Sequence, residues 1–317
     1  MQTIANIIIA VEHGIGLDII LWFQSWRTDL ISGLFMPFAW MGTEAFFLML
    51  LTLVYWVIHK DTGRRLMVYF LFSAWFNAFA KEVFKRPRPF VVSDRVKPAL
   101  AAAEYGLPSG HTQAGTVIGS VIIREAGKPW VTVLLVLYIL LTGVSRMVHG
   151  VHFPQDVLLG WILGILIVVS LYRLEARLAR FLAGMHWGTM LAITLGTAAA
   201  VIGLTFLTHP TPAGVVGALT PGAALIGVIP GLFLESRYIR FSSRGSLGKK
   251  CLRYAVGIAT ALLFKEGLKP LLAVVNDHSL FMDASVRIVR YAVLGLWLSA
   301  GAPWLFTRLR LAERESA

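Results

Sequence analysis

Long apolar runs recur along the whole chain, and they limit its possible folds more than any other feature. A helix of about 20 mostly apolar residues crosses the ~30 Å hydrocarbon core of a membrane. Such runs lie near 31–58, 64–86, 110–126, 129–148, 153–174, 187–207, 213–234, 250–275 and 286–307. Mean hydropathy is +0.71 and only 15% of residues are charged, which is unlike a soluble domain. We therefore predict an all-α, polytopic transmembrane helix bundle with about nine spans.

A shorter pattern precedes the first run. Ile15, Ile19, Trp22 and Trp26 recur at helical spacing opposite Asp18. An amphipathic helix of this kind suits the membrane interface, although an ordinary packed helix gives the same pattern. We expect an interfacial helix within residues 1–30.

The net charge of +12 follows the alternation of the runs. If the spans alternate, one side of the membrane receives Lys60, Arg64, Arg65, Arg124, Lys128, Arg173, Arg177, Arg180, Arg237, Arg240, Arg244, Lys249, Lys250, Arg308, Arg310 and Arg314. Cytoplasmic loops collect Lys and Arg, so this side should be cytoplasmic. No recognisable nucleic-acid module accompanies the charge, and we expect no nucleic-acid partner. The single cysteine, Cys251, allows no internal disulfide and should be a packed, reduced thiol.

Basic residues on the opposite side gather at the end of the run near 64–86. Lys81 lies inside that apolar end, where an unpaired ammonium is costly and an anion is the natural partner. Arg88 and Arg146 add planar forks of donors that match phosphate oxygens. Because three cations in one place repel one another, a bound phosphate group would relieve the conflict.

The segment Pro108-Ser109-Gly110-His111 has the character of a helix start. Ser109 is a good N-cap, and Gly110 lets another group approach the backbone. Unpaired N–H groups and the helix dipole make such a start an anion site. Ser109 as a simple cap is an equally good interpretation of these four residues alone.

A third polar segment, Ser145 to Asp156, joins two apolar runs. Pro154 is suited to the first position of a helix. Asp156, in the first turn, can reach back to one nitrogen of His152, which leaves the other nitrogen as nucleophile or base. A second histidine, His149, falls outside this arrangement, and we expect a structural role for it.

A metal site is the alternative for His111, His149, His152 and Asp156, because imidazoles and a carboxylate suit zinc. The surrounding cations oppose a dication at this place. We therefore expect no metal and no cofactor.

The three polar segments are Lys81 to Pro89 (K-x6-R-P), Pro108 to His111 (P-S-G-H) and Ser145 to Asp156 (S-R-x5-H-x3-D). Together they resemble the signature motifs of the type 2 phosphatidic acid phosphatase superfamily. The resemblance covers roughly residues 64 to 175. It implies a helical core shared with vanadium haloperoxidases and bacterial acid phosphatases. Leu107, where many relatives have an aromatic residue, is a mild departure from the pattern.

The resemblance also implies roles for the matching residues. His152 would be the nucleophile, Asp156 its orienter, and His111 the acid that protonates the leaving group. The phosphoryl oxygens would be bound by Lys81, Arg88, Ser109, Gly110 and Arg146. These residues can position the phosphoryl group and neutralise its charge.

We thus predict an integral membrane, metal-independent phosphatase that hydrolyses a lipid phosphate or diphosphate, such as polyprenyl diphosphate or phosphatidate, through a phosphohistidine. Its partners would be that substrate and membrane lipids. We expect it in a bacterial inner membrane with the site on the non-cytoplasmic side. The expected segments are the N-terminal interfacial helix (1–30), a catalytic transmembrane core (31–180) and additional C-terminal transmembrane helices (181–317).

Three other functions fit part of this pattern. A lipid-linked phosphotransferase would use an acceptor other than water. A transporter or scramblase of lipid phosphates would not need His152, Asp156 and His111 together. A haloperoxidase is disfavoured by the membrane spans, since those relatives are soluble.

Overall fold

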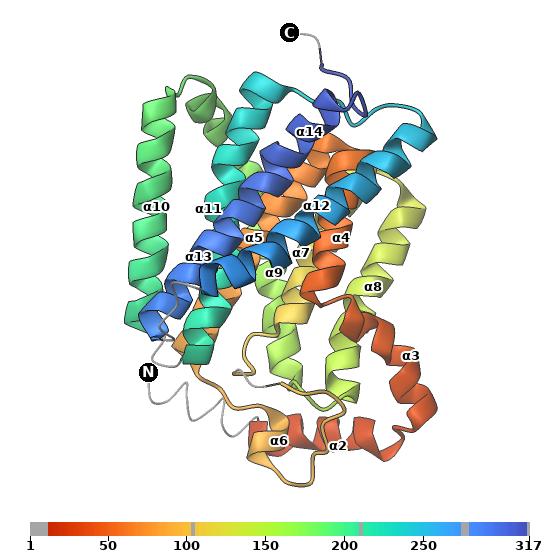
Figure 1. The fold of residues 1–317 in the computed structure, drawn as a ribbon. Helices are drawn as coiled ribbons and strands as arrows, with labels where there is room; N and C mark the ends of the chain where they lie inside the picture. Colours follow the sequence, from red (N-terminus) through yellow and green to blue (C-terminus); the bar gives the residue numbers. More distant parts are fainter. Residues whose placement is uncertain (1–11, 103–104, 209–211, 274–278, 316–317) are drawn as a thin grey trace. The chain divides into compact units, whose positions relative to one another are not determined.

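A computed structural model describes residues 12–102, 105–208, 212–273 and 279–315, and these residues are helical apart from loops and one isolated bridge between Phe241 and Arg314. The elements, drawn in Figure 1, are η1 (Glu12–Gly16), α2 (Leu17–Ser25), α3 (Asp29–Trp40), α4 (Glu44–Leu53), η2 (Val54–Ile58), α5 (Lys60–Phe84), α6 (Pro89–Val92), α7 (Gly110–Ala126), α8 (Pro129–Val148), α9 (Pro154–Ala183), α10 (Trp187–Thr208), α11 (Pro212–Leu234), η3 (Glu235–Ile239), α12 (Leu247–Ala273), α13 (Leu280–Leu296), η4 (Trp297–Gly301) and α14 (Ala302–Arg308). The predicted all-α fold is confirmed.

The described parts of the predicted apolar runs are mostly helical, and the run near 31–58 is divided by a break between Trp40 and Glu44. Fewer than nine helices satisfy both length and hydropathy for a span. Among the described residues, five helices do so: Pro129–Val148, Pro154–Leu178, Trp187–Thr208, Gly217–Ile239 and Leu280–Arg308. A sixth span results if Asp29–Trp40 and the bent continuation Glu44–Ile58 are counted together. The other predicted runs fall short because α7 has only 17 residues and because α5 and α12 carry charges such as Lys81 and Lys265.

The chain divides into two compact units, of which the first comprises Met1–Phe47 and Phe76–Val169. Within it, α2, α3 and α7 contact α8. A Cβ at Gly119 would come 2.8 Å from Ile139 of α8, and one at Gly160 would come 2.9 Å from the Ser109 carbonyl. These glycines therefore allow close packing of helices, as their spacing predicts.

Helix α2 packs beneath the polar loops of this unit. Ile20 is fully buried against Val96 and Phe153, and the Gln24 amide donates to the Lys97 carbonyl at 2.9 Å. The opposite surface of the helix is exposed, with Trp22 60% accessible. Residues 1–11 lie outside the described part, and the interfacial location of this helix remains a prediction.

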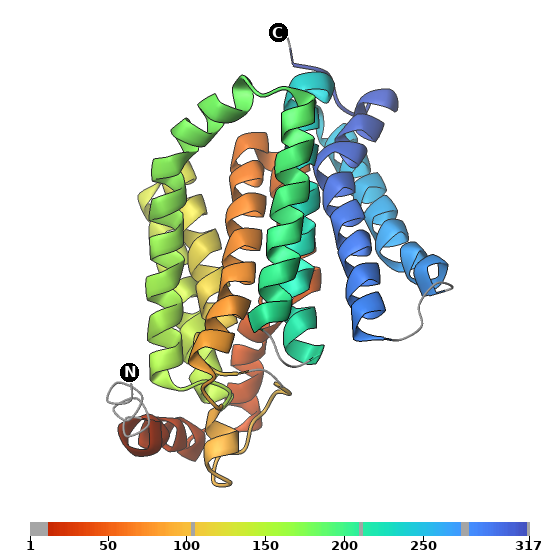
Figure 2. The ribbon, with the colours of Figure 1, turned by 90° about the vertical axis from the view of Figure 1, so that its left-hand side faces the viewer.

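The second unit comprises Leu48–Trp75 and Ser170–Ala317. In it α11 packs against α10 and α13, and α12 against α13; the last pair forms the two blue helices of Figure 2. Cys251, on α12, is exposed, so the prediction of a packed thiol is wrong. The predicted segments 1–30, 31–180 and 181–317 divide the chain differently from the two units and remain a prediction.

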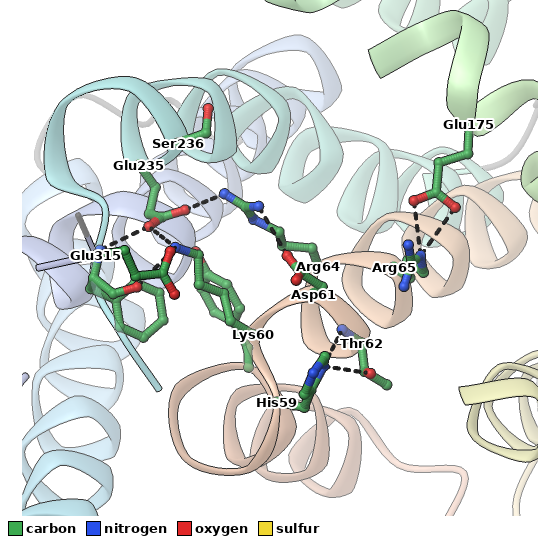
Figure 3. Close-up of polar contacts among 12 residues, drawn as sticks. His59, Lys60, Asp61, Thr62, Arg64, Arg65, Glu175, Glu235, Ser236 and Glu315 are labelled. Carbon is green, nitrogen blue, oxygen red and sulfur yellow. Dashed lines mark hydrogen bonds and ion pairs between the residues drawn. The ribbon is translucent and has the colours of Figure 1, made fainter. Parts of the chain in front are cut away.

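A buried ion-pair cluster joins distant parts of the second unit (Figure 3). The Glu235 carboxylate is fully buried, lies 3.0 Å from Lys60 Nζ and accepts a hydrogen bond from Arg64. It also accepts from the backbone N–H of Phe241 at 3.1 Å. Lys60 pairs in addition with Glu315 at 2.7 Å. Glu235 therefore links α5 to the segment that follows α11 through buried ion pairs.

Candidate active site

His152 and Asp156 form the pair expected at the start of α9. The helix begins at Pro154, and its first turn carries Asp156, which is fully buried. Asp156 Oδ2 accepts from the backbone N–H of Phe153 at 2.9 Å and lies 3.2 Å from His152 Nδ1. A carboxylate can only accept, so Nδ1 carries the hydrogen.

The opposite nitrogen of His152 faces a cation. Arg88 Nη1 lies 3.1 Å from His152 Nε2 and donates to the Val151 carbonyl at 2.9 Å. A guanidinium has no acceptor, so Nε2 accepts this bond with its lone pair. The ring is therefore a neutral imidazole whose Nε2 lone pair is turned toward Arg88.

The pKa of His152 lies well below its usual value of 6.5, because burial disfavours the charged ring. The charges of Arg88, then Lys81, then Arg146 lower it further. These three motif cations, Lys81, Arg88 and Arg146, were predicted to gather on one side of the membrane. All three act on the same imidazole.

Arg146 and Lys81 are buried at helix ends. Arg146, in the last turn of α8, is 3% exposed, and its Nε donates to Ser145 Oγ at 3.2 Å. Among the described residues its Nη2 is buried without a hydrogen-bond partner. Lys81, in the last turn of α5, is 7% exposed. Because an unsatisfied buried donor is costly, Arg146 is suited to an anionic oxygen.

Ser109 stands at the N-cap of α7, but its side chain does not cap the helix. Its Oγ pairs with Thr112 Oγ1 at 2.9 Å, and its backbone N–H donates to the Asp156 carbonyl at 3.0 Å. Gly110 begins the helix, and a Cβ there would lie 3.2 Å from Asn77 Oδ1. The simple-cap interpretation of Ser109 is therefore wrong, because the hydroxyl bonds to a side chain instead of a helix N–H.

His111 and His149 hydrogen-bond to backbone carbonyls, and His111 also acts electrostatically on His152. His111 Nε2 lies 3.3 Å from the Ala39 carbonyl. His149 is fully buried, with Nε2 3.4 Å from the Ser32 carbonyl, as a structural role predicts. Within the described ranges, no three His, Cys, Asp or Glu side chains gather into a group that could hold a metal ion.

The motifs did not reveal Asn77 or Gln113. The buried Asn77 amide donates to Gln113 Oε1 at 2.8 Å and faces the Pro108 carbonyl at 3.4 Å. This pair ties α5 to the start of α7. Its only signal in the sequence is that Asn77 precedes Lys81 by one helical turn and so shares its face.

Comparison with known proteins now decides the family. Residues 62–180 match the sequence profile described as "PAP2 superfamily", and residues 219–314 match the profile "PAP2 superfamily phosphatase, transmembrane extension". The chain belongs to the PAP2 superfamily. This is the type 2 phosphatidic acid phosphatase superfamily that the motifs resemble, a family of metal-independent hydrolases. The predicted family and the integral membrane character are confirmed.

Relatives differ in how much of their length the chain matches. Human sphingosine-1-phosphate phosphatase 2 is 32% identical over 145 residues, covering 44% of this chain and 36% of that protein. Dihydrosphingosine 1-phosphate phosphatase YSR3 of Saccharomyces cerevisiae is 26% identical over 249 residues, covering 71% and 59%. The chain thus spans less than two thirds of either relative. A transmembrane PAP2-type phosphatidylglycerolphosphate phosphatase from Bacillus subtilis, a solved structure, aligns over 56% of this chain and 94% of its own, with 22% identity and a TM-score of 0.46.

Proposed function

We propose that this PAP2-superfamily protein is a lipid phosphate phosphatase that works through a phosphohistidine at His152. The supporting observation is the bonding of one imidazole: Asp156 accepts from Nδ1, so the lone pair of Nε2 is free for phosphorus once a phosphate oxygen takes over the Arg88 donor. In the first step Nε2 bonds to phosphorus as the phosphorus–oxygen bond to the lipid breaks. His111 gives its proton to the departing oxygen.

In the second step, water attacks the phosphohistidine, inorganic phosphate leaves, and His152 Nε2 recovers its lone pair. The deprotonated His111 takes the proton of that water. Acid–base help of this kind contributes about 10²–10⁴ in rate.

The phosphate cradle in this proposal consists of Lys81, Arg88, Arg146, Ser109 and Gly110. Arg146 Nη2, which is buried without a hydrogen-bond partner in the described part of the chain, supports this assignment. Phosphoryl transfer requires mainly positioning and neutralisation of charge on the equatorial oxygens. Preorganised buried donors are effective at both, because they need little reorganisation.

Sphingoid base phosphates are the first substrates to test, because two relatives are named for such substrates. Phosphatidate and polyprenyl diphosphate offer the same terminal phosphate on other lipids, so they belong in the same panel. We propose that the site opens on the non-cytoplasmic side of the membrane, since Lys60, Arg64 and Arg65 lie at the opposite end of α5 from Lys81.

The test is phosphate release by the purified protein in detergent from this panel, with EDTA and with vanadate. We expect release from at least one lipid phosphate, resistance to EDTA, and inhibition by vanadate, which imitates the transition state. His152→Ala should be inactive. If activity is lost on chelation and restored by metal, or if His152→Ala remains active, the proposal is wrong. Comparing release with and without an alcohol acceptor separates hydrolysis from phosphotransfer.

A further inference from the structure

The break between α3 and α4 lies against the imidazole of His111. Helix α3 ends at Trp40 and α4 begins at Glu44, so residues 41–43 form the break. The carbonyl of Ala39, in the last turn of α3, lies 3.3 Å from His111 Nε2. A carbonyl can only accept, so Nε2 carries a hydrogen in this contact.

Gly42 leaves room for the ring. A Cβ built on Gly42 would overlap Cδ2 and Nε2 of His111. The backbone of Gly42 does not adopt a positive φ, so the absent side chain, and not unusual backbone geometry, is what this position requires. By contrast, a Cβ on Gly33 of α3 would meet nothing within 4 Å.

The same carbonyl is held in place by its own surroundings. The Gly42 N–H donates to the Ala39 carbonyl at 3.2 Å. Ala39 is 8% exposed, and α3 packs against α8, the helix that carries Arg146. The acceptor for His111 is therefore fixed relative to a residue of the phosphate cradle.

We propose that the Ala39 carbonyl and Gly42 form a seat that positions His111 as the acid for the leaving group. The proposal rests on the proposed function for the role of His111. Proton transfer needs the donor within about 2.6–3.2 Å of the departing oxygen, and a displacement of ~1 Å can cost ~10²-fold in rate. Neither residue touches the phosphate, so both are positioning residues.

The seat is tested with Gly42→Ala, using Gly33→Ala as the matched control. A methyl at Gly42 forces the ring to move, and the ring is the end of a rotatable side chain, so the fold should tolerate the change. We expect kcat on a sphingoid base phosphate to fall about ten-fold or more. On p-nitrophenyl phosphate, whose leaving group needs little protonation, kcat should change less than about three-fold. Gly33→Ala should behave as wild type on both.

Two further measurements separate the seat from a general structural effect. In a His111→Ala background, Gly42→Ala should cause no additional loss, because the displaced ring is absent. In ¹⁵N-histidine-labelled protein, Gly42→Ala should shift the His111 Nε2 resonance, whereas Gly33→Ala should not.

Equal losses on the two substrates, an additive loss in the His111→Ala background, or an unmoved Nε2 resonance would each overturn the seat. If the wild-type protein releases no phosphate from any substrate while the Gly42→Ala resonance shift is observed, the proposed function fails and the seat stands as a structural contact.

Discussion

Replacing the carboxylate of Asp156 by an amide tests how His152 is oriented. Two hydrogen bonds fall on Oδ2 of this carboxylate, from His152 Nδ1 at 3.2 Å and from the Phe153 N–H at 2.9 Å. In Asp156→Asn, the amide oxygen can occupy the same position and keep both contacts. The substitution therefore removes charge while it preserves shape.

The expected loss follows from the strengths of these two bonds. A charge-assisted hydrogen bond is worth about 1–1.5 kcal/mol more than a neutral one. For two bonds the difference is about 2–3 kcal/mol, which corresponds to a ~30- to ~150-fold loss in kcat if the transition state feels all of it. Asp156→Ala removes both acceptors, leaves a buried N–H without a partner and should lose at least ~10³-fold.

The assay is steady-state phosphate release by each variant in detergent, with thermal melting to verify folding. Glu175→Gln is the control, because it makes the same acid-to-amide change on the same helix at an ion pair with Arg65 of 2.9 Å. It should retain nearly full activity. If folded Asp156→Asn has the wild-type kcat, the carboxylate does not orient or stabilise His152.

Three other predictions concern the protonation of His152, the buried Glu235 ion pair and the orientation in the membrane. With p-nitrophenyl phosphate, which needs little acid from His111, kcat/KM should show no loss centred on pH 6.5, because burial and then Arg88 hold the pKa of His152 well below 6.5 and keep the ring neutral. A loss with its midpoint at 6.5 would contradict the burial argument. Glu235→Gln should lower the melting temperature far more than Glu315→Gln. Breaking the buried pair of Glu235 with Lys60 should cost about 3–5 kcal/mol, whereas losing the half-exposed Glu315 carboxylate should cost under ~1 kcal/mol; equal shifts in melting temperature would refute this. In a Cys251→Ser background, a cysteine that replaces the exposed Arg95 should react with an impermeant maleimide in intact cells. A cysteine that replaces the exposed Ser246 should react only after permeabilisation, and the reverse labelling would overturn the proposed orientation of the protein in the membrane.

Features that depend on neighbouring residues could be predicted from the sequence. Apolar length alone located α8, whose bounds 129–148 match the predicted run. The His152–Asp156 contact was predictable because Pro154 starts a helix and Asp156 follows within its first turn. The motif cations could be brought together because each stands at the end of an apolar run.

Contacts between distant segments could not be predicted in the same way. The pairing of Glu235 with Lys60 joins residues 175 positions apart, and nothing local to either residue indicates the other. The overlap of Gly42 with His111 depends on how a helix break meets the start of α7. Fewer described helices than the nine predicted runs meet the length and hydropathy criteria for a span, because the apolar pattern does not fix where a helix such as the 17-residue α7 begins and ends.

The central claim is that phosphate passes through His152, and trapping the intermediate tests it most directly. The protein would be mixed with a ³²P-labelled lipid phosphate and quenched without acid, because phosphohistidine is acid-labile. It would then be digested, and the labelled peptide would be sequenced by mass spectrometry. The account predicts label on His152 in the wild type and none in His152→Ala. Label on any other residue, or label that persists in His152→Ala, would contradict it.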